Sequence, residues 1–444
     1  MRDSFETLTG SSVSPSTAGM HLRSSIHPIL TLALSAILFL SSPVQNVVQG
    51  AESVIGRRGF SVIWNMPTAR CQRRYGVSLP LRQYNIVHNS QQRFQGQNMS
   101  IFYQRRLGLY PYINRQGSKI NGGLPQQGFL KAHLSLAEAQ IIEVLRQMFS
   151  GLAVLDWEAW QPIWMWNFGT RIAYRKFSKK LVRWKHPDMS EEEVKSKAKA
   201  EFELAARAFM EKTLRLGVRL CPEGLWGFYG FPGCYNNHGQ GQSGYTGQCH
   251  NGTAILNDRL AFLWQHSTAL YPSIYLWRKL AGHTHAQLMV RHRVLEALRV
   301  ASQHSLGTEA LPVFPYARVA FTHTLMFLNQ TDLEHTLGES AALGAAGVVL
   351  WGELSFAKSK RQCALLRDYL GSVLGDYVTA LQASVRNCSE RMCNAQGRCA
   401  RLDPHSGYMI PLLDTHEALS DMRSKFKCMC YKGWSGEQCD QNNF

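Results

Sequence analysis

Acidic residues are scarce in this 444-residue chain: 31 Asp and Glu stand against 48 Lys and Arg, a formal net charge of +17. The sequence also lacks a phosphate-binding P-loop, a glycine-rich dinucleotide fingerprint, a nucleic-acid-binding motif and internal repeats. These absences exclude the common nucleotide-dependent enzymes and the repeat architectures, and we expect no nucleic-acid partner. The basic charge favours polyanionic partners in general, and by itself it does not choose among them.

Long apolar runs are missing as well. The apolar stretch 29–40 is shorter than the roughly 20 residues of a membrane-spanning helix, and it follows the basic residues Arg23 and His27. This pattern predicts a secretory leader over residues 1–50, cleaved before about Glu52, with an uncleaved anchor as the alternative. No hydrophobic tail follows the cysteine-rich end, so we expect no integral membrane span after leader removal.

Paired C-x2-C spacings are absent, which argues against a zinc site although the chain has 11 cysteines. Six of the cysteines lie between Cys388 and Cys439, in the pattern C-x4-C-x5-C, a 28-residue gap (400–427) and C-x-C-x8-C. Glycines and a tryptophan interrupt the last interval, which is typical of an EGF-like module. We therefore predict disulfides in an oxidising compartment, hence a secreted or lysosomal protein. Sequons for N-glycosylation occur at Asn98, Asn251, Asn329 and Asn387.

Short apolar runs alternate with helical patterns from residue 60 onward. A capping box at Ser190 and Glu193 opens the clearest helix, and two others are expected over 285–301 and 358–380. Alternating strands and helices predict a parallel sheet with crossover helices. We expect an α/β fold: a distorted (β/α)7–8 barrel over residues 51–380, then an EGF-like module with an inserted loop over 381–444. The predicted strands are 60–64, 85–89, 100–104, 152–158, 225–231, 273–277, 311–319 and 345–353.

The run GLAVLDWEAW (151–160) ends a buried strand with two carboxylates. Asp156 and Glu158 are two positions apart, so on a strand they share a face, roughly 6–7 Å apart, while Trp157 points the other way. Because like charges repel, one carboxyl group should keep its proton to a higher pH, as a general acid requires. The alternative is an acidic pair that forms salt bridges or caps a loop. In a barrel, active residues lie at the C-terminal ends of strands, where this pair falls.

Aromatic residues gather at other predicted strand ends, among them Tyr229, Tyr275 and Trp351. Each could simply fill the core. Together they suit a glycan-binding cleft, because aromatic faces stack on sugar rings and tyrosine hydroxyls bond their polar edges. The segment 171–185 carries seven basic residues at helical spacing. Such a face is either merely solvated or attracts a polyanion.

The sequence resembles the animal hyaluronidases of glycoside hydrolase family 56, and most of all their hyaluronidase-3 type. The resemblance covers about residues 58–440 and is carried by LAVLDWEAW, LWGFYGFPGCYN, ALYPSIYLW, RHRVLEALRV, LGESAALGAAGVVLWG and CMCYKGWSGEQC. It implies an endo-β-N-acetylhexosaminidase that hydrolyses β-1,4 bonds of hyaluronan, with chondroitin as a second substrate, by a retaining, substrate-assisted mechanism. It implies no metal or organic cofactor, and we expect a monomer.

The resemblance also implies roles for residues. Glu158 would be the general acid and base, Asp156 its electrostatic partner, and Tyr229 would orient the acetamido group of the substrate. Tyr103, Tyr275 and Trp351 would shape sugar subsites, and Arg293 would meet a glucuronate carboxylate. The disulfides implied are Cys71–Cys363, Cys234–Cys249, Cys388–Cys399, Cys393–Cys428 and Cys430–Cys439, which leaves Cys221 as a buried thiol.

The sequence departs from the family pattern at Gly233, where strongly active members carry Asp before the cysteine. A carboxylate near Tyr229 is therefore missing, and we expect an intact catalytic pair with low turnover. Two other hypotheses stay open: a weakly active or inactive secreted glycoprotein that binds hyaluronan, and a structural glycoprotein that acts through its EGF-like end.

Overall fold

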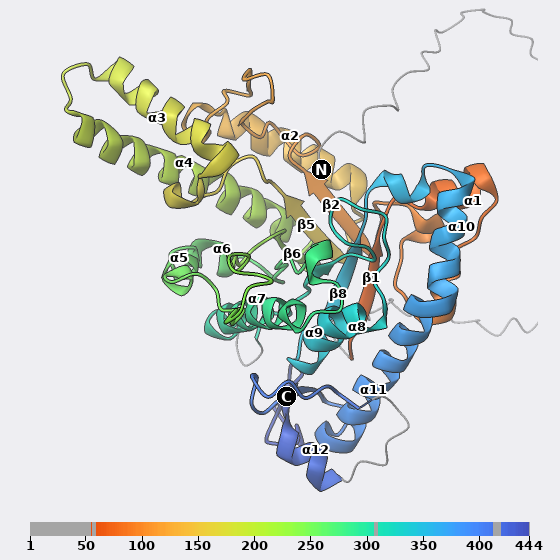
Figure 1. The fold of residues 1–444 in the computed structure, drawn as a ribbon. Helices are drawn as coiled ribbons and strands as arrows, with labels where there is room; N and C mark the ends of the chain where they lie inside the picture. The colour runs from red at the N-terminus through yellow and green to blue at the C-terminus, as the bar shows by residue number, and fades with distance from the viewer. Residues whose placement is uncertain (1–54, 56–58, 306–309, 412–418, 444) are drawn as a thin grey trace, which may run out of the picture. The chain divides into compact units, whose positions relative to one another are not determined.

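The computed structural model describes residue 55 and residues 59–305, 310–411 and 419–443. The predicted leader lies outside the described residues. Two three-stranded parallel sheets form the centre (Figure 1). Their strands are short and almost wholly buried, which explains their continuous apolar sequences. One sheet has the order β1 (Ser61–Asn65), β8 (Gly347–Trp351), β7 (Tyr316–Ala317), and the other β2 (Met99–Tyr103), β5 (Leu152–Asp156), β6 (Leu225–Phe228).

Isolated bridges extend the two sheets toward each other. Tyr229 pairs with Tyr271, Leu270 with Val313, and Ser273 with Tyr316, so the segment around 271 lies between β6 and β7. At the other end, Val87 pairs with Ile63 of β1. The result is a mixed α/β fold, and among the described residues no regular strand ladder closes it into a full barrel.

The prediction of strands over 85–89 and 273–277 is wrong. Each of these segments makes only one of the isolated bridges. Near the first, Asn85 adopts a left-handed backbone conformation, and the side chain of Asn89 takes over the pairing with β2. Asn89 accepts from the Met99 amide at 3.1 Å and donates to the Met99 carbonyl at 2.7 Å. Near the second, Pro272 has no N–H to donate to a ladder.

Helices connect the strands much as the alternating pattern predicts (Figure 1). The Ser190–Glu193 capping box is present at the start of α4, and the helix predicted over 285–301 is α7. The longer helices are α2 (Leu130–Val144), α3 (Ile172–Lys185), α4 (Glu191–Leu220), α7 (Thr284–Gln303), α10 (Lys360–Tyr369) and α11 (Gly375–Cys393). The shorter ones are α1 (Ala69–Tyr75), α5 (Thr253–Asp258), α6 (Ala261–Trp264), α8 (Gln330–Leu333), α9 (Glu339–Ala342) and α12 (Leu419–Lys425).

The C-terminal region is rich in disulfides and continuous with the helix before it. A π-helical turn, Leu370–Leu374, joins α10 to α11, and α11 runs through the predicted domain boundary between residues 380 and 381. Two small antiparallel sheets of two strands follow, β9 (Gly397–Arg401) with β10 (Phe426–Cys430) and β11 (Trp434–Ser435) with β12 (Gln441–Asn442). A separate hairpin, β3 (Tyr112–Ile113) with β4 (Lys119–Ile120), follows β2.

Five disulfides form, and their pairs are those that the family resemblance implied. Cys71–Cys363 links α1 to α10, and Cys234–Cys249 closes a loop after β6. Cys388–Cys399 and Cys393–Cys428 tie α11 to β9 and β10, and Cys430–Cys439 ties β10 to the loop between β11 and β12. Cys221 is a buried free thiol.

A buried ion cluster joins β9 of the C-terminal region to the central fold. Glu339, on α9 and fully buried, accepts hydrogen bonds from Arg291 Nε on α7 at 2.7 Å and from Arg401 Nη1 on β9 at 2.8 Å. Burial alone would raise the pKa of Glu339, but the hydrogen bonds and charges of Arg401 and Arg291 outweigh it and lower that pKa below its usual value. The carboxylate therefore stays charged into acidic solution.

Three of the four predicted glycan acceptors are exposed. Asn98, Asn251 and Asn329 lie at the surface, and Asn329 also caps α8 with its side chain. Asn387 is half-buried on α11, beside the disulfide of Cys388. Among the helices of the described ranges, none combines the length and the apolar character that crossing a membrane demands.

Replacing Glu339 should destabilise the fold strongly. Glu339→Gln leaves the guanidinium groups of Arg291 and Arg401 buried without a counter-charge, and we expect the free energy of unfolding to fall by about 3 kcal/mol or more. Urea unfolding followed by circular dichroism measures this. The matched control is Glu192→Gln, which breaks only an exposed pair with Lys195 and should cost less than about 1 kcal/mol. Equal losses in the two variants would contradict the assigned role of Glu339.

Candidate active site

The paired carboxylates lie at the C-terminal end of β5. Asp156 is the last residue of that strand and is 9% exposed, while Glu158 lies just beyond it and is half-buried. The strand thus ends two residues earlier than predicted, because Trp157 leaves the ladder to pack against Tyr110 and Phe228, with ring centroids 4.8 and 5.5 Å away. The side chains of Asp156 and Glu158 nevertheless face a common neighbourhood, since both act electrostatically on the same two tyrosines.

Tyr103 and Trp351 bring the ends of the two sheets together beside this pair. Tyr103 ends β2 in register with Asp156, and its hydroxyl accepts a hydrogen bond from Trp351 Nε1, at the end of β8, at 3.0 Å. Burial raises the pKa of Tyr103, and the negative charge of Asp156 raises it further. The hydroxyl therefore keeps its proton and remains a neutral hydrogen-bonding group.

Tyr229 follows β6 and lies on the other side of β5. Burial, and then the charge of Glu158, raise its pKa far above the ordinary value of a tyrosine. Its hydroxyl is 3.3 Å from Ser273 Oγ, and its ring is 6.0 Å from that of Tyr275. Tyr275 in turn stacks on Trp351 at 6.0 Å. The four aromatic residues predicted to bind substrate or orient it therefore form one connected group around the carboxylate pair.

Sequence reasoning missed two residues of this group. Arg318 is 2% exposed, and its guanidinium lies 5.7 Å from the Tyr275 ring and 5.2 Å from the Trp351 ring. Its Nη2 is 2.8 Å from a carboxylate oxygen of Glu353. Tyr316 on β7 packs edge-on against Tyr229 at 5.0 Å. The only sequence signal for Arg318 and Tyr316 was their position in the apolar run 311–319, which is predicted as a strand.

Arg293 holds the loop after β6 in place. It donates from Nε to Asn236 Oδ1 at 2.9 Å, from Nη1 to the Ser273 carbonyl at 2.7 Å and from Nη2 to Asn237 Oδ1 at 2.9 Å. Burial lowers the pKa of Arg293, which nevertheless remains a cation in neutral solution. The side chain predicted to meet a substrate carboxylate is thus fixed close to Tyr229 by three protein acceptors.

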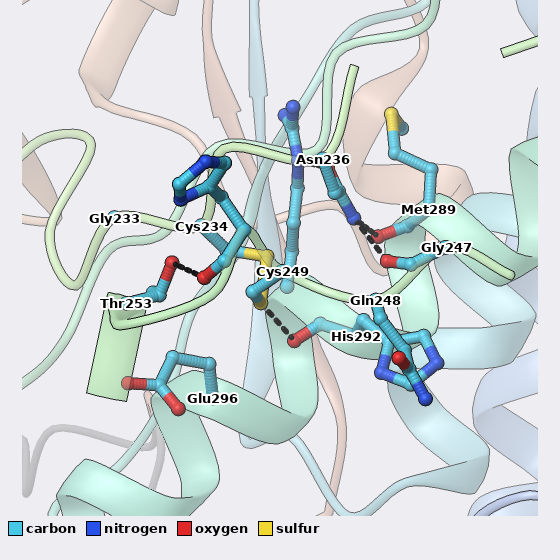
Figure 2. Close-up of a disulfide and its surroundings, with 12 residues drawn as sticks. Gly233, Cys234, Asn236, Gly247, Gln248, Cys249, Thr253, Met289, His292 and Glu296 are labelled. Carbon is cyan, nitrogen blue, oxygen red and sulfur yellow. Dashed lines mark hydrogen bonds between the residues drawn. A yellow bond between two sulfur atoms is a disulfide. The ribbon is translucent and has the colours of Figure 1, made fainter. Parts of the chain in front are cut away.

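Gly233 stands beside the disulfide that closes this loop (Figure 2). Its carbonyl accepts from Asn257 Nδ2 at 2.9 Å. A Cβ at position 233 would meet only Tyr235, whose ring carbon Cε2 would be 3.7 Å away, an ordinary contact distance. A Cβ therefore fits at position 233 without a clash.

The helix α3 starts next to the carboxylate pair. Arg171, the residue before α3, donates from Nε to the Glu158 carbonyl at 3.0 Å, and the basic residues predicted over 171–185 follow along that helix. In the part of the chain that the structure describes, no group of three or more His, Cys, Asp or Glu side chains could hold a metal ion. Proton transfer and hydrogen bonding are the chemistry that these side chains offer.

Comparison with known proteins agrees with this geometry. The hyaluronidase model of glycoside hydrolase family 56 matches residues 49–443. Human (Homo sapiens) hyaluronidase-3 is 45% identical over 414 residues, 93% of this chain and 96% of that protein. Pig (Sus scrofa) hyaluronidase-1 is 41% identical over 437 residues, 93% of this chain and 98% of that protein.

A solved structure is similar as well. The crystal structure of bee venom hyaluronidase in complex with a hyaluronic acid tetramer superposes with a TM-score of 0.67 and 33% identity, over 72% of this chain and 98% of that one. With most of the chain matched in sequence and in fold, this protein belongs to glycoside hydrolase family 56, the hyaluronidases.

Proposed function

We propose that this protein is an endo-β-N-acetylhexosaminidase that hydrolyses β-1,4 bonds of hyaluronan by a retaining, substrate-assisted mechanism. The observation that carries the proposal is the meeting of Asp156 and Glu158 with Tyr103, Tyr229, Tyr275 and Trp351 at the C-terminal ends of parallel strands. The crystal structure of the bee venom relative in complex with a hyaluronic acid tetramer supports the choice of substrate. Chondroitin, built on the same alternation of uronate and N-acetylated sugar, is the second substrate.

Glu158 is the proton donor and then the proton acceptor in this proposal. The acetamido carbonyl oxygen of the substrate attacks the anomeric carbon, the glycosidic C–O bond breaks, and Glu158 gives its proton to the leaving oxygen. Water then attacks the same carbon and loses its proton to Glu158, while the bond between that carbon and the acetamido oxygen breaks, so two inversions retain the configuration. The half-buried position of Glu158 suits this role, since it is open to substrate and partly shielded from water.

Asp156 and Tyr229 act on the acetamido group. The negative charge of Asp156 stabilises the positive charge that develops there when its oxygen attacks, and the low exposure of Asp156 strengthens this effect. The raised pKa of Tyr229 keeps its hydroxyl protonated, so it can donate a hydrogen bond to the acetamido oxygen and orient it.

The remaining aromatic residues bind the neighbouring sugars. Tyr103, Tyr275 and Trp351 offer ring faces and edges for sugar rings, and buried Arg318 behind Tyr275 and Trp351 fixes their orientation. Arg293 attracts a glucuronate carboxylate. The proposal also includes a fold, a distorted (β/α) barrel with an EGF-like C-terminal module. The five disulfides favour the secretory pathway as the location of the protein.

A second candidate function is hyaluronan binding with little hydrolysis. The observation in its favour is Gly233, which places no carboxylate beside Tyr235 in the loop that follows Tyr229. The same fold and aromatic group would then hold the polysaccharide, with the chemistry weakened at one position.

Glu158→Gln should abolish hydrolysis and leave binding intact, because the amide keeps the shape of the side chain and loses its transferable proton. We expect the rate of reducing-end release from hyaluronan to fall by at least about 10²-fold. Affinity electrophoresis with hyaluronan should show unchanged binding. A variant that cleaves at the wild-type rate would remove Glu158 from the mechanism.

Gly233→Asp should raise the rate of hyaluronan cleavage, since it restores a carboxylate at a position where a Cβ makes only an ordinary contact. Gly233→Asn is the matched control, with the same shape and no charge, and it should not raise the rate. Reducing-end release from the purified proteins measures both. If wild type already cleaves as fast as the Asp variant, the glycine is no handicap.

A further inference from the structure

Two exposed aromatic residues lie outside the aromatic group of the candidate active site. Phe168 is 51% exposed and Tyr235 37% exposed, and their rings meet edge to face with centroids 5.7 Å apart. Trp166, which is buried, packs against Tyr235 at 5.8 Å and supports it from within. Large aromatic side chains left in water give up hydrophobic stabilisation, so an exposed pair in contact is a surface that a ligand could cover. We name Phe168 and Tyr235 the aromatic platform.

The segment before Phe168 is held rigidly. Asn167 is fully buried, and its side chain donates to the carbonyls of Gln161 at 2.8 Å and Ile163 at 3.1 Å and accepts from the Gln161 amide at 2.9 Å. After Phe168 the chain enters a tight turn, in which Gly169 adopts a positive φ and the Arg171 amide donates to the Phe168 carbonyl at 3.1 Å. Phe168 is therefore exposed because its backbone holds it there.

The residues on either side of Tyr235 are held in a similar way (Figure 2). The residue before it, Cys234, is bound to Cys249, and the residue after it, Asn236, is buried. Asn236 Nδ2 donates to the carbonyls of Gly247 at 2.7 Å and Met289 at 3.0 Å, while its Oδ1 accepts from Arg293. Two exposed rings on two braced segments resemble a pre-organised binding surface more than two mobile surface residues, because little side-chain order remains to be lost on binding.

Two cations lie beside the platform. The backbone amide of Arg171 donates to the Phe168 carbonyl at 3.1 Å, and Arg293 Nε donates to Asn236, the residue after Tyr235, at 2.9 Å. In agreement with this, burial raises the pKa of the Tyr235 hydroxyl and the charges of Arg171 and Arg293 lower it. Arg171 also links the platform to the catalytic pair, since its Nε donates to the Glu158 carbonyl. An anionic group bound against the platform would therefore meet a favourable potential within reach of Glu158.

We propose that Phe168, Tyr235 and Arg171 form a further sugar-binding subsite for an anionic polysaccharide, on the β6 side of the catalytic carboxylates. The rings of Phe168 and Tyr235 contact the apolar face of one sugar, and Arg171 attracts the uronate carboxylate next to it. This inference rests on the proposed function, because it extends the same polysaccharide beyond the residues around Tyr229. It assigns a role to two aromatic residues outside that group.

Binding to a non-hydrolysing background tests the subsite. All variants carry Glu158→Gln, and the dissociation constant for size-defined hyaluronan oligosaccharides is measured by isothermal titration calorimetry. Phe168→Ala and Tyr235→Ala should each weaken binding, on the order of tenfold, while Tyr235→Phe, which keeps the ring, should bind nearly as the parent does. The matched control is Trp184→Ala, which removes a still more exposed aromatic residue (79%) near the far end of α3. Its affinity should not change.

Activity gives the second readout. In the active enzyme, Phe168→Ala should raise KM about tenfold and leave kcat within about twofold, because the subsite holds substrate and transition state equally. Platform variants that bind hyaluronan like their parent would overturn the subsite, even with hydrolysis intact. A neutral polysaccharide such as dextran bound as tightly as hyaluronan would overturn the anionic class of the ligand. Failure of the proposed function would appear separately, as a wild type that releases no reducing ends while platform variants still differ in binding.

Discussion

The hydrogen bond from Trp351 Nε1 to the Tyr103 hydroxyl is the contact on which the candidate site depends. It joins the last residue of β8 to the last residue of β2, which belong to different sheets and are not paired by any regular ladder among the described strands. Because Tyr103 is in register with Asp156, this contact fixes the width of the site at the carboxylates. Tyr275 and Tyr229 complete the connection from Trp351 back toward Glu158 through ring contacts. Side-chain contacts therefore connect the two sheets at the site, where no regular strand ladder joins them among the described residues.

Two arginines, Arg293 and Arg318, stabilise the segments around the site by donating hydrogen bonds to neutral acceptors or by packing against aromatic rings. Arg293 donates to two asparagine side chains and a carbonyl, and Arg318 lies against two rings with Glu353 nearby. These cations stay charged when buried, so they add positive potential to the candidate site while they also order its loops. The same arginine side chains therefore order the loops of the site and supply positive charge near the acidic pair, in a chain whose net charge is +17.

Much of this arrangement could be predicted from sequence, and the reasons for success and failure are physical. The run ending in Asp156 and the Ser190 capping box are local patterns, and both elements form. The segments 85–89 and 273–277 look like strands, but whether a segment pairs along its length depends on neighbours distant in sequence, and each makes one bridge. Arg318 escaped notice because nothing in its own segment tells a buried arginine from an exposed one. The role of Arg171 was visible only as part of a basic helix, not as a partner of the Glu158 carbonyl.

The continuity of α11 with the disulfide-rich end has a consequence for protein engineering. The helix α11 runs from the central fold to within a few residues of β9, and Glu339 of α9 depends on Arg401 of that strand. A chimaera that exchanges the C-terminal region between relatives must therefore transplant α9 with its arginine partner, or keep both native. The disulfide-rich C-terminal region therefore contributes to the stability of the central fold through the buried Glu339–Arg401 contact.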